Sequence, residues 1–260
     1  MRPRRLGHVL LLSAFTLVLA GCAKRETAVD EGARTRTLLI GNSAEPASVD
    51  PHVVNAYTDQ IILVALFEGL TVLEEQTSQP IPGAAERWEI SRDGLVYTFH
   101  LRAGARWSNG EPVTARDFAF SFQRMLTPGF AAEYSYMLWA IKNAERFNKG
   151  EVKDFSAVGV EVVDDRTLRL TLAGIRSTLL AELADPLLSP VHESMEAVLK
   201  EQAYWSQPEK LVTNGAFQLE RASADGYRLR ASPHYRDRAG VRLSAVQFIR
   251  VGSMSMAQLL

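Results

Sequence analysis

Pairs of strand-like segments joined by short turns recur along this sequence and constrain its fold more than any other feature. Residues 158–163 and 167–172 form one such pair, and residues 216–221 and 227–231 form another. In residues 97–101, apolar and polar side chains alternate with the period of a half-buried strand. Helical segments lie between the pairs and do not follow every strand, which argues against a regular parallel-strand and helix repeat. The pattern predicts a mixed α/β (α+β) fold.

Three segments have the apolar spacing of helices that bury one face. The first covers residues 59–70. The second begins after Thr114, where Asp117 three residues later completes a variant of the capping box. The third, residues 179–199, is interrupted by two prolines and should be broken into shorter pieces.

The N-terminus has the layout of a bacterial export signal. Three arginines among the first five residues precede residues 9–20, an uncharged run too short to span a bilayer. Leu19-Ala20-Gly21-Cys22 follows and resembles a lipobox, in which an acylated Cys22 would anchor the chain to a membrane. The alternative is a free cysteine after an ordinary apolar segment. We expect residues 1–21 to be a lipoprotein signal peptide and residues 22–36 to be a flexible tether.

Charge and cysteine content exclude two classes of protein. The chain has 29 Lys and Arg against 30 Asp and Glu, a formal net charge of -1. A nucleic-acid-binding protein needs a concentrated basic face, so we expect no nucleic-acid partner. Cys22 is the only cysteine, so an internal disulfide is impossible.

Glu45, Asp50 and His52 lie close enough in the sequence to suggest a metal site or an acid–base pair. Their spacing is generic, and a loop whose side chains cap backbone amides is the favoured interpretation. The sequence has no Gly-x-Ser-x-Gly elbow and no glycine-rich phosphate loop. We expect a binding protein with no catalytic residue, no metal and no cofactor. The alternative is a secreted hydrolase that uses these three side chains.

Two groups of side chains could contact a ligand. Tyr134, Tyr136 and Trp139 cluster near a loop, and amphipathic rings can both pack against a ligand and hydrogen-bond it. Packing in the core explains this cluster equally well. Asn55 and Tyr57 lie between a proline-rich loop and a helix, where they could point into a cleft.

Four motifs, in their order and spacing, are together highly specific. They are Glu45-Pro46-Ala47-Ser48-Val49-Asp50-Pro51-His52, Phe67-Glu68-Gly69-Leu70, Trp107-Ser108-Asn109-Gly110-Glu111-Pro112-Val113-Thr114-Ala115-x-Asp117-Phe118 and Thr213-Asn214-Gly215-Ala216-Phe217. The sequence that contains them resembles the bacterial oligopeptide-binding proteins of peptide ABC transporters, an extracytoplasmic solute-binding family that includes dipeptide and nickel binders. The resemblance runs from about Thr37 to the last residue.

The resemblance implies two lobes that close about a hinge over an extended oligopeptide. The peptide main chain would be held by strand-like hydrogen bonds, with its side chains in roomy, hydrated pockets. The closed form would dock on an ABC permease in the inner membrane. The resemblance thus implies a monomeric protein of the periplasm or cell envelope. The lipobox implies attachment to a membrane through lipid on Cys22.

The resemblance also implies ligand-binding residues. Tyr134 falls on the family's ligand-contacting tyrosine. Asn55 aligns with a position that is acidic in the best-known oligopeptide binders and is neutral here, and Tyr57 lies close by. Residues 174–178 and 232–236 depart from the family pattern, the latter reading Ser-Pro-His-Tyr-Arg where the family has Asn-Pro-x-Tyr-Trp.

The resemblance further implies a division into domains. Residues 37–67 and 189–260 would form an incomplete first lobe, and residues 68–188 an inserted small domain. Family members continue past Leu260, and the last strand, residues 245–251, leads into what reads as a helix just beginning. We therefore expect a truncated form that lacks the second lobe.

Other ligands and roles stay open. Within the class of binding proteins, the ligand could be a murein peptide, a nickel chelate or haem. A lipoprotein that acts as a signal receptor or chaperone is a further alternative.

Overall fold

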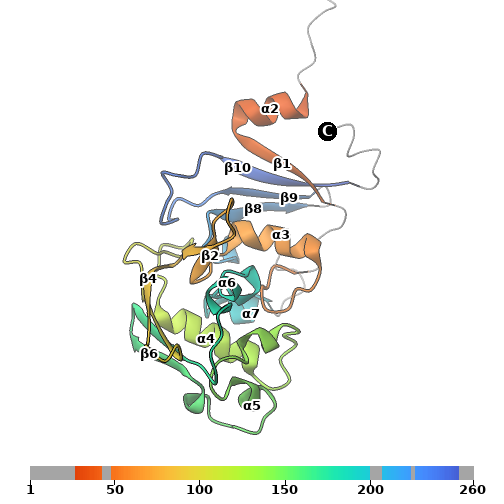
Figure 1. Cartoon of the computed structure of the whole chain (residues 1–260). Helices are drawn as coiled ribbons and strands as arrows, with labels where there is room; N and C mark the ends of the chain where they lie inside the picture. The colour runs from red at the N-terminus through yellow and green to blue at the C-terminus, as the bar shows by residue number, and fades with distance from the viewer. Residues whose placement is uncertain (1–26, 43–47, 200–206, 224–225, 252–260) are drawn as a thin grey trace, which may run out of the picture.

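The structure is a computed structural model that describes residues 27–42, 48–199, 207–223 and 226–251. One end of the molecule is a four-stranded sheet (Figure 1). Its order is β1-β10-β9-β8, with β1 parallel to β10 and the other pairs antiparallel. The sheet therefore joins the beginning of the described chain to its end. Its strands are β1 (Thr37–Asn42), β8 (Phe217–Ser223), β9 (Gly226–Ala231) and β10 (Ala245–Arg250).

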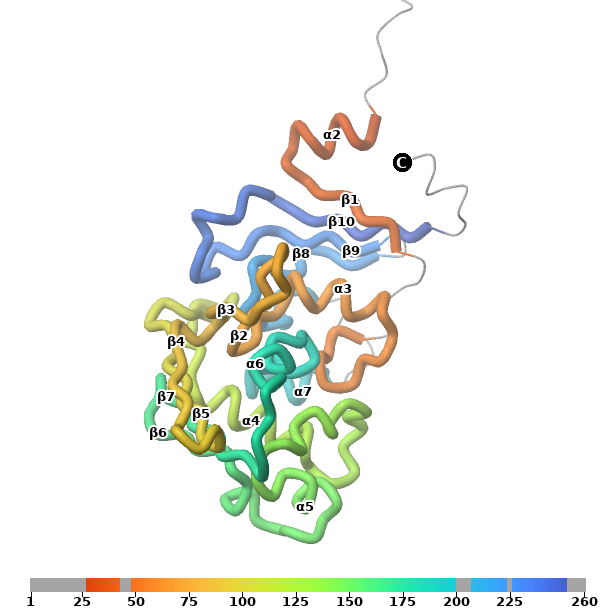
Figure 2. The backbone as a smooth tube through the Cα atoms, viewed as in Figure 1, coloured from red at the N-terminus to blue at the C-terminus, as the bar shows by residue number. Residues whose placement is uncertain are grey.

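A second four-stranded sheet, fully antiparallel, lies at the other end of the molecule (Figure 2). Its order is β4-β5-β7-β6. Tyr97, Phe99 and Leu101 are buried and alternate with half-buried residues, which confirms the predicted period of two. The strands are β4 (Ala85–Ile90), β5 (Val96–Leu101), β6 (Val160–Asp164) and β7 (Thr167–Thr171).

Helix α4 (Ala115–Leu126) covers this second sheet, in contact with β6 and β7. It begins as predicted, because Thr114 donates from its backbone N–H and its Oγ1 to Oδ2 of Asp117, at 2.7 and 2.8 Å. Phe118 and Phe122 are fully buried, so these rings are core residues. The capping box and the apolar stripe together fix the start of the helix and the face that it buries.

Helix α3 (Tyr57–Leu66) lies between the two sheets (Figures 1 and 2). The sequence predicted a helix over residues 59–70, and the helix in fact ends at Leu66. Its last carbonyl, on Leu66, accepts a hydrogen bond from the N–H of Gly215 at 2.8 Å. A side chain at Gly215 would sit 2.5 Å from the Leu66 backbone, so the two segments touch through their main chains. This contact takes the place of a further helical turn.

Shorter elements connect these parts. The predicted helical region 179–199 is broken at its prolines, as expected. The short elements are β2 (Thr71–Leu73), β3 (Pro80–Pro82), η1 (Ser135–Leu138), α5 (Ala144–Asn148), η2 (Phe155–Ala157), α6 (Leu179–Glu182), η3 (Pro186–Leu188), α7 (Met195–Leu199) and η5 (Pro208–Lys210).

The expectation of a flexible tether over residues 22–36 is wrong for its second half. Residues Ala28–Thr35 form helix α2. Thr27 and Asp30 form a full capping box, with the Asp30 N–H donating to Thr27 Oγ1 at 3.1 Å. Gly32 lets the helix pack directly against β1, because a side chain there would meet the Thr37 carbonyl at 2.8 Å. Capping and this backbone contact stabilise the helix without an apolar period.

The predicted hairpins, the first and last strands and the mixed α/β class are confirmed. The lipobox with Cys22, the acid Glu45 and the C-terminal segment 252–260 lie outside the described residues. Within the described residues, no helix has the length and apolar content needed to cross a membrane.

Candidate functional site

A hollow of about 410 Å³ opens where three distant segments meet. Helix α3 contributes Gln60, the η1 turn contributes aromatic and apolar side chains, and the α6–η3 region contributes charged ones. The hollow therefore combines rings, an amide and ionic groups on one surface, the composition of a site for a small polar ligand. Its lining consists of Gln60, Tyr134, Tyr136, Met137, Arg176, Glu182, Asp185 and Leu187.

Tyr134 stands at the wall of this hollow. It directly precedes η1, with its side chain partly buried, and its ring centroid lies 6.1 Å from that of Tyr136 at an angle of 44°. Tyr136 is 55% exposed. Neither phenol hydroxyl has a hydrogen-bond partner among the described residues, so both are available to a ligand.

Asn55 lies beside the same turn, although 78 positions separate it from Glu133. Its Nδ2 donates to Oε2 of Glu133 at 3.1 Å, which ties the loop before α3 to the segment that carries Tyr134. Tyr57 is the first residue of α3 and is 76% exposed, but it does not line the hollow. The structure thus brings Asn55 and Tyr134 together and leaves Tyr57 at the margin.

Trp139, the third member of the aromatic cluster, is turned away from the hollow. Its Nε1 donates to Oδ1 of Asn148 at 3.2 Å, and Nζ of Lys149 lies 5.1 Å from its ring centroid. Its indole lines a different hollow, together with Lys142 and Arg146. The cluster therefore divides, with two tyrosines at the candidate site and the tryptophan outside it.

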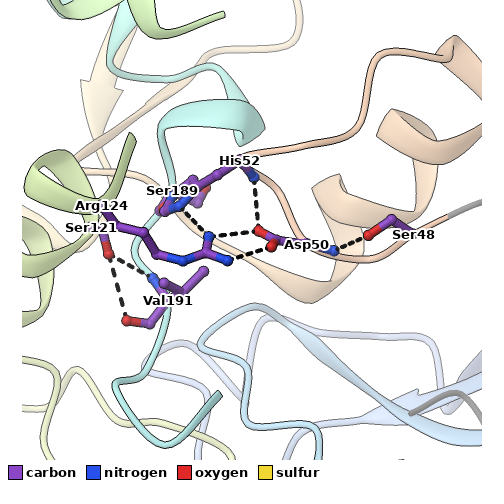
Figure 3. Close-up of polar contacts among 7 residues, drawn as sticks. All are labelled: Ser48, Asp50, His52, Ser121, Arg124, Ser189 and Val191. Carbon is purple, nitrogen blue, oxygen red and sulfur yellow. Dashed lines mark hydrogen bonds and ion pairs between the residues drawn. The ribbon is translucent and has the colours of Figure 1, made fainter. Parts of the chain in front are cut away.

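The loop that leads to Asn55 is held in place by a buried ionic cluster (Figure 3). Both carboxylate oxygens of Asp50 accept from Arg124 of α4, at 2.6 and 2.9 Å. The N–H of His52 donates to Asp50 Oδ1, and Ser48 Oγ accepts from the Asp50 N–H. Burial raises the pKa of Asp50, but the Arg124 hydrogen bond and the nearby charges outweigh it and hold the pKa below its ordinary value.

His52 is neutral in this cluster. Arg124 Nη1 can only donate, so Nδ1 of His52 accepts at 2.8 Å, and its Nε2–H donates to the Ser189 carbonyl at 3.1 Å. Burial lowers the pKa of His52 to about 4, against the attraction of Asp50. Asp50 is paired with Arg124 and both ring nitrogens of His52 are hydrogen-bonded, so these two side chains fix a loop. Glu45, the third residue of the hydrolase alternative, lies outside the described residues. Among the described residues, no three His, Cys, Asp or Glu side chains are placed to hold a metal.

The buried His52 makes a prediction for the pH dependence of stability. The unfolded chain takes up a proton at His52 near pH 6.5, whereas the folded chain does so only near pH 4. The contribution of neutral His52 to the free energy of unfolding is complete above pH 6.5. It is lost as the pH falls from about 6.5 to 4, by about 1.4 kcal/mol per pH unit.

Urea unfolding at pH 7.5 and 5.5 tests this. In His52→Asn, whose Oδ1 can accept from Arg124, the stability lost between the two pH values should be smaller by about 1 kcal/mol. Equal losses in the two proteins would show that His52 is not held neutral.

A second buried cluster joins the segment after α3 to the loop after β9. Glu68, just after α3, accepts from Arg236 through both oxygens, with contacts of 2.7 and 2.8 Å, and from the Tyr235 hydroxyl at 2.7 Å. The side chain of Asn214 bonds both the N–H and the carbonyl of Glu68, at 3.0 and 2.8 Å. Burial and the charge of Glu68 raise the pKa of Tyr235. This network fixes the sheet that contains β9 against the chain that leaves α3.

The order of the motifs and this geometry agree with one family of proteins. The family model described as bacterial extracellular solute-binding proteins, family 5, middle region, matches residues 79–260. This chain belongs to that family. Its structural neighbours have the periplasmic-binding-protein-like fold, of which the chain represents a part.

Relatives in family 5 include proteins named for peptides. The periplasmic oligopeptide-binding protein OppA of Salmonella typhimurium is 36% identical over 251 residues, covering 94% of this chain and 45% of that protein. The dipeptide-binding protein DppE of Bacillus subtilis is 32% identical over 259 residues, covering 96% and 47%. The chain therefore spans just under half the length of these relatives. The structure of Haemophilus influenzae OppA in complex with RPPGFSPFR superposes with a TM-score of 0.78 at 30% identity, covering 85% and 43%.

Two of the family 5 motifs have structural roles. Asp50 accepts from the His52 N–H, which confirms the favoured interpretation of a loop whose side chains cap backbone amides. Asn214 and Gly215 hydrogen-bond the chain at the end of α3, a contact that the sequence did not predict. The lining residues Arg176, Glu182 and Asp185 were missed, because no local pattern marks them. Only the fold of α6 and η3 brings them beside Tyr134.

Proposed function

We propose that this chain belongs to a peptide importer, in which it captures oligopeptides outside the inner membrane and delivers them to an ABC-type permease. The observation that supports this proposal is the hollow beside Tyr134, which combines two phenols, an amide and charges of both signs. Relatives in the same family include oligopeptide-binding and dipeptide-binding proteins. A peptide presents main-chain donors and acceptors throughout its length. Rings and amides in a wet hollow can bind these groups without selecting one sequence.

The proposal includes the organisation and location of the protein. Residues 37–67 with 189–260 form one lobe, residues 68–188 form an inserted domain, and a second lobe outside these residues closes over the ligand. The protein acts as a monomer in the periplasm or cell envelope, held on a membrane by lipid at Cys22 after removal of residues 1–21. Metabolic labelling with a fatty-acid analogue tests the anchor, and Cys22→Ser should remain unlabelled.

Isothermal titration tests the ligand class. The protein, expressed from its complete reading frame, is titrated with mixed tri- to pentapeptides, and saturable binding is expected. A heat of binding with a nickel chelate or haem, and none with peptides, would contradict the proposal. Peptides recovered intact after long incubation would argue further against the hydrolase alternative.

Tyr134 should contribute strongly to peptide affinity. Because tyrosines in binding sites supply both apolar area and a hydroxyl, Tyr134→Ala is expected to weaken peptide binding by at least about tenfold. Tyr134→Phe removes only the hydroxyl, so it distinguishes the contribution of the hydroxyl to peptide affinity from that of the ring. Trp139→Phe is the control, since this ring lies in the same segment but outside the hollow. Unchanged affinity in Tyr134→Ala would remove this residue from the site.

A further inference from the structure

Three ionic side chains line the hollow beside Tyr134, and two of them neutralise each other. Arg176 donates from Nε to Oε1 of Glu182 at 2.9 Å and from Nη2 at 2.5 Å. Thr178 Oγ1 donates to the same carboxylate at 2.8 Å. The guanidinium, which is the cation of the hollow, is thus already engaged within the protein. Asp185 is left as the charge without a counterion.

The carboxylate of Asp185 is held in place but not neutralised. Its Oδ1 accepts from the N–H of Leu187 at 2.9 Å, which caps η3. Among the described residues, it has no ion-pair partner. Burial raises the pKa of Asp185, against the effect of this hydrogen bond. A nearby cation stabilises the charged form of a half-buried carboxylate of this kind.

The rest of the lining suits the stem and the head of a basic side chain. Met137 is only partly buried and offers apolar surface to a chain of methylene groups, whereas Leu187 lines the hollow but is 3% exposed. The faces of Tyr134 and Tyr136 attract a cation through their π-electrons. The volume of about 410 Å³ exceeds that of one side chain and leaves room for bridging water.

We propose that this hollow is the subsite for a lysine or arginine side chain of the bound peptide, with Asp185 as the residue that determines its charge preference. An acidic side chain would face Asp185 without a free cation to offset it. An apolar side chain would gain the Met137 contact but leave the carboxylate unpaired. This inference rests on the proposed function and adds the chemical class of one peptide residue.

The test compares alanine tetrapeptides that carry lysine, norleucine or glutamate at one position, with each position taken in turn. Norleucine keeps the four-carbon side chain of lysine and lacks its terminal ammonium group. At the position that reaches the hollow, the wild-type protein should bind the lysine peptide about tenfold or more tightly than the norleucine peptide. The glutamate peptide should bind most weakly.

Asp185→Asn should bring the lysine-to-norleucine affinity ratio close to one, because asparagine can cap η3 but carries no charge. Asp185→Ser, which can also cap, is the second variant. Asp154→Asn is the matched control, since Asp154 caps η2 by the same bond, from Ser156 N–H at 2.9 Å, and lies outside the hollow. The control should keep the wild-type ratio.

The outcomes separate the two proposals. If no peptide binds, the proposed function and the subsite both fail. If peptides bind but lysine and norleucine are equal at every position, the subsite is overturned and the function stands. A lysine preference that survives both Asp185 substitutions, or that Asp154→Asn abolishes equally, also overturns the assignment to Asp185.

Discussion

Arg124→Ala is expected to lower the free energy of unfolding by about 3–5 kcal/mol, because it leaves the buried Asp50 carboxylate without its partner. The side chains of Arg124 and Asp50 are only 9% and 5% exposed. The same substitution removes the donor to His52 Nδ1. Urea unfolding followed by circular dichroism measures the change.

Arg116→Ala is the matched control on the same helix. Arg116 pairs with Asp165 at 3.2 Å, and these side chains are 74% and 70% exposed. Exposed pairs contribute about 0–1 kcal/mol, so this variant should remain close to the wild type. Similar small losses in the two variants would contradict the role of the Asp50–Arg124 pair as an anchor.

Arg236→Ala should destabilise the protein by about 3 kcal/mol or more, since Glu68 would stay buried with an uncompensated charge. Glu68 follows α3 and Arg236 follows β9, so the loss should loosen the first sheet from the rest of the molecule. Chemical denaturation followed by near-UV circular dichroism detects this change.

Arg228→Ala provides the comparison for Arg236. Its pair with Glu220 at 2.7 Å joins neighbouring strands of the same sheet and is 35% and 41% exposed. A loss of about 1 kcal/mol or less is expected. If Arg236→Ala lowers the free energy of unfolding no more than Arg228→Ala does, the contact between the first sheet and the segment after α3 does not depend on the Glu68–Arg236 ion pair.

Local sequence signals predicted much of the fold, because the information lies within a few residues. The Thr114–Asp117 capping box and the alternation along β5 depend on neighbours in sequence. The Thr27–Asp30 box is the same kind of signal, but residues 28–35 lack an apolar period in sequence, so the pattern did not predict a helix there. Packing of Gly32 on β1 stabilises that helix, and only the folded chain shows this contact.

The site was less predictable, since its residues come from three separate segments. The contact of Asn55 with Glu133 spans 78 positions, and Arg236, at a departure from the family pattern, proves to pair with a glutamate 168 residues away. Nothing near Asp185 in the sequence marks it as a wall of a hollow. Such residues are identified by long-range packing and not by local composition.

Hydrogen–deuterium exchange with and without a saturating oligopeptide tests the central claim most directly. Peptide bound beside Tyr134 should slow exchange at backbone amides of residues 55–60 and 133–137. Exchange in β6 and β7, which do not line the hollow, should be unchanged. Protection confined to other segments, with the peptide demonstrably bound, would contradict the account.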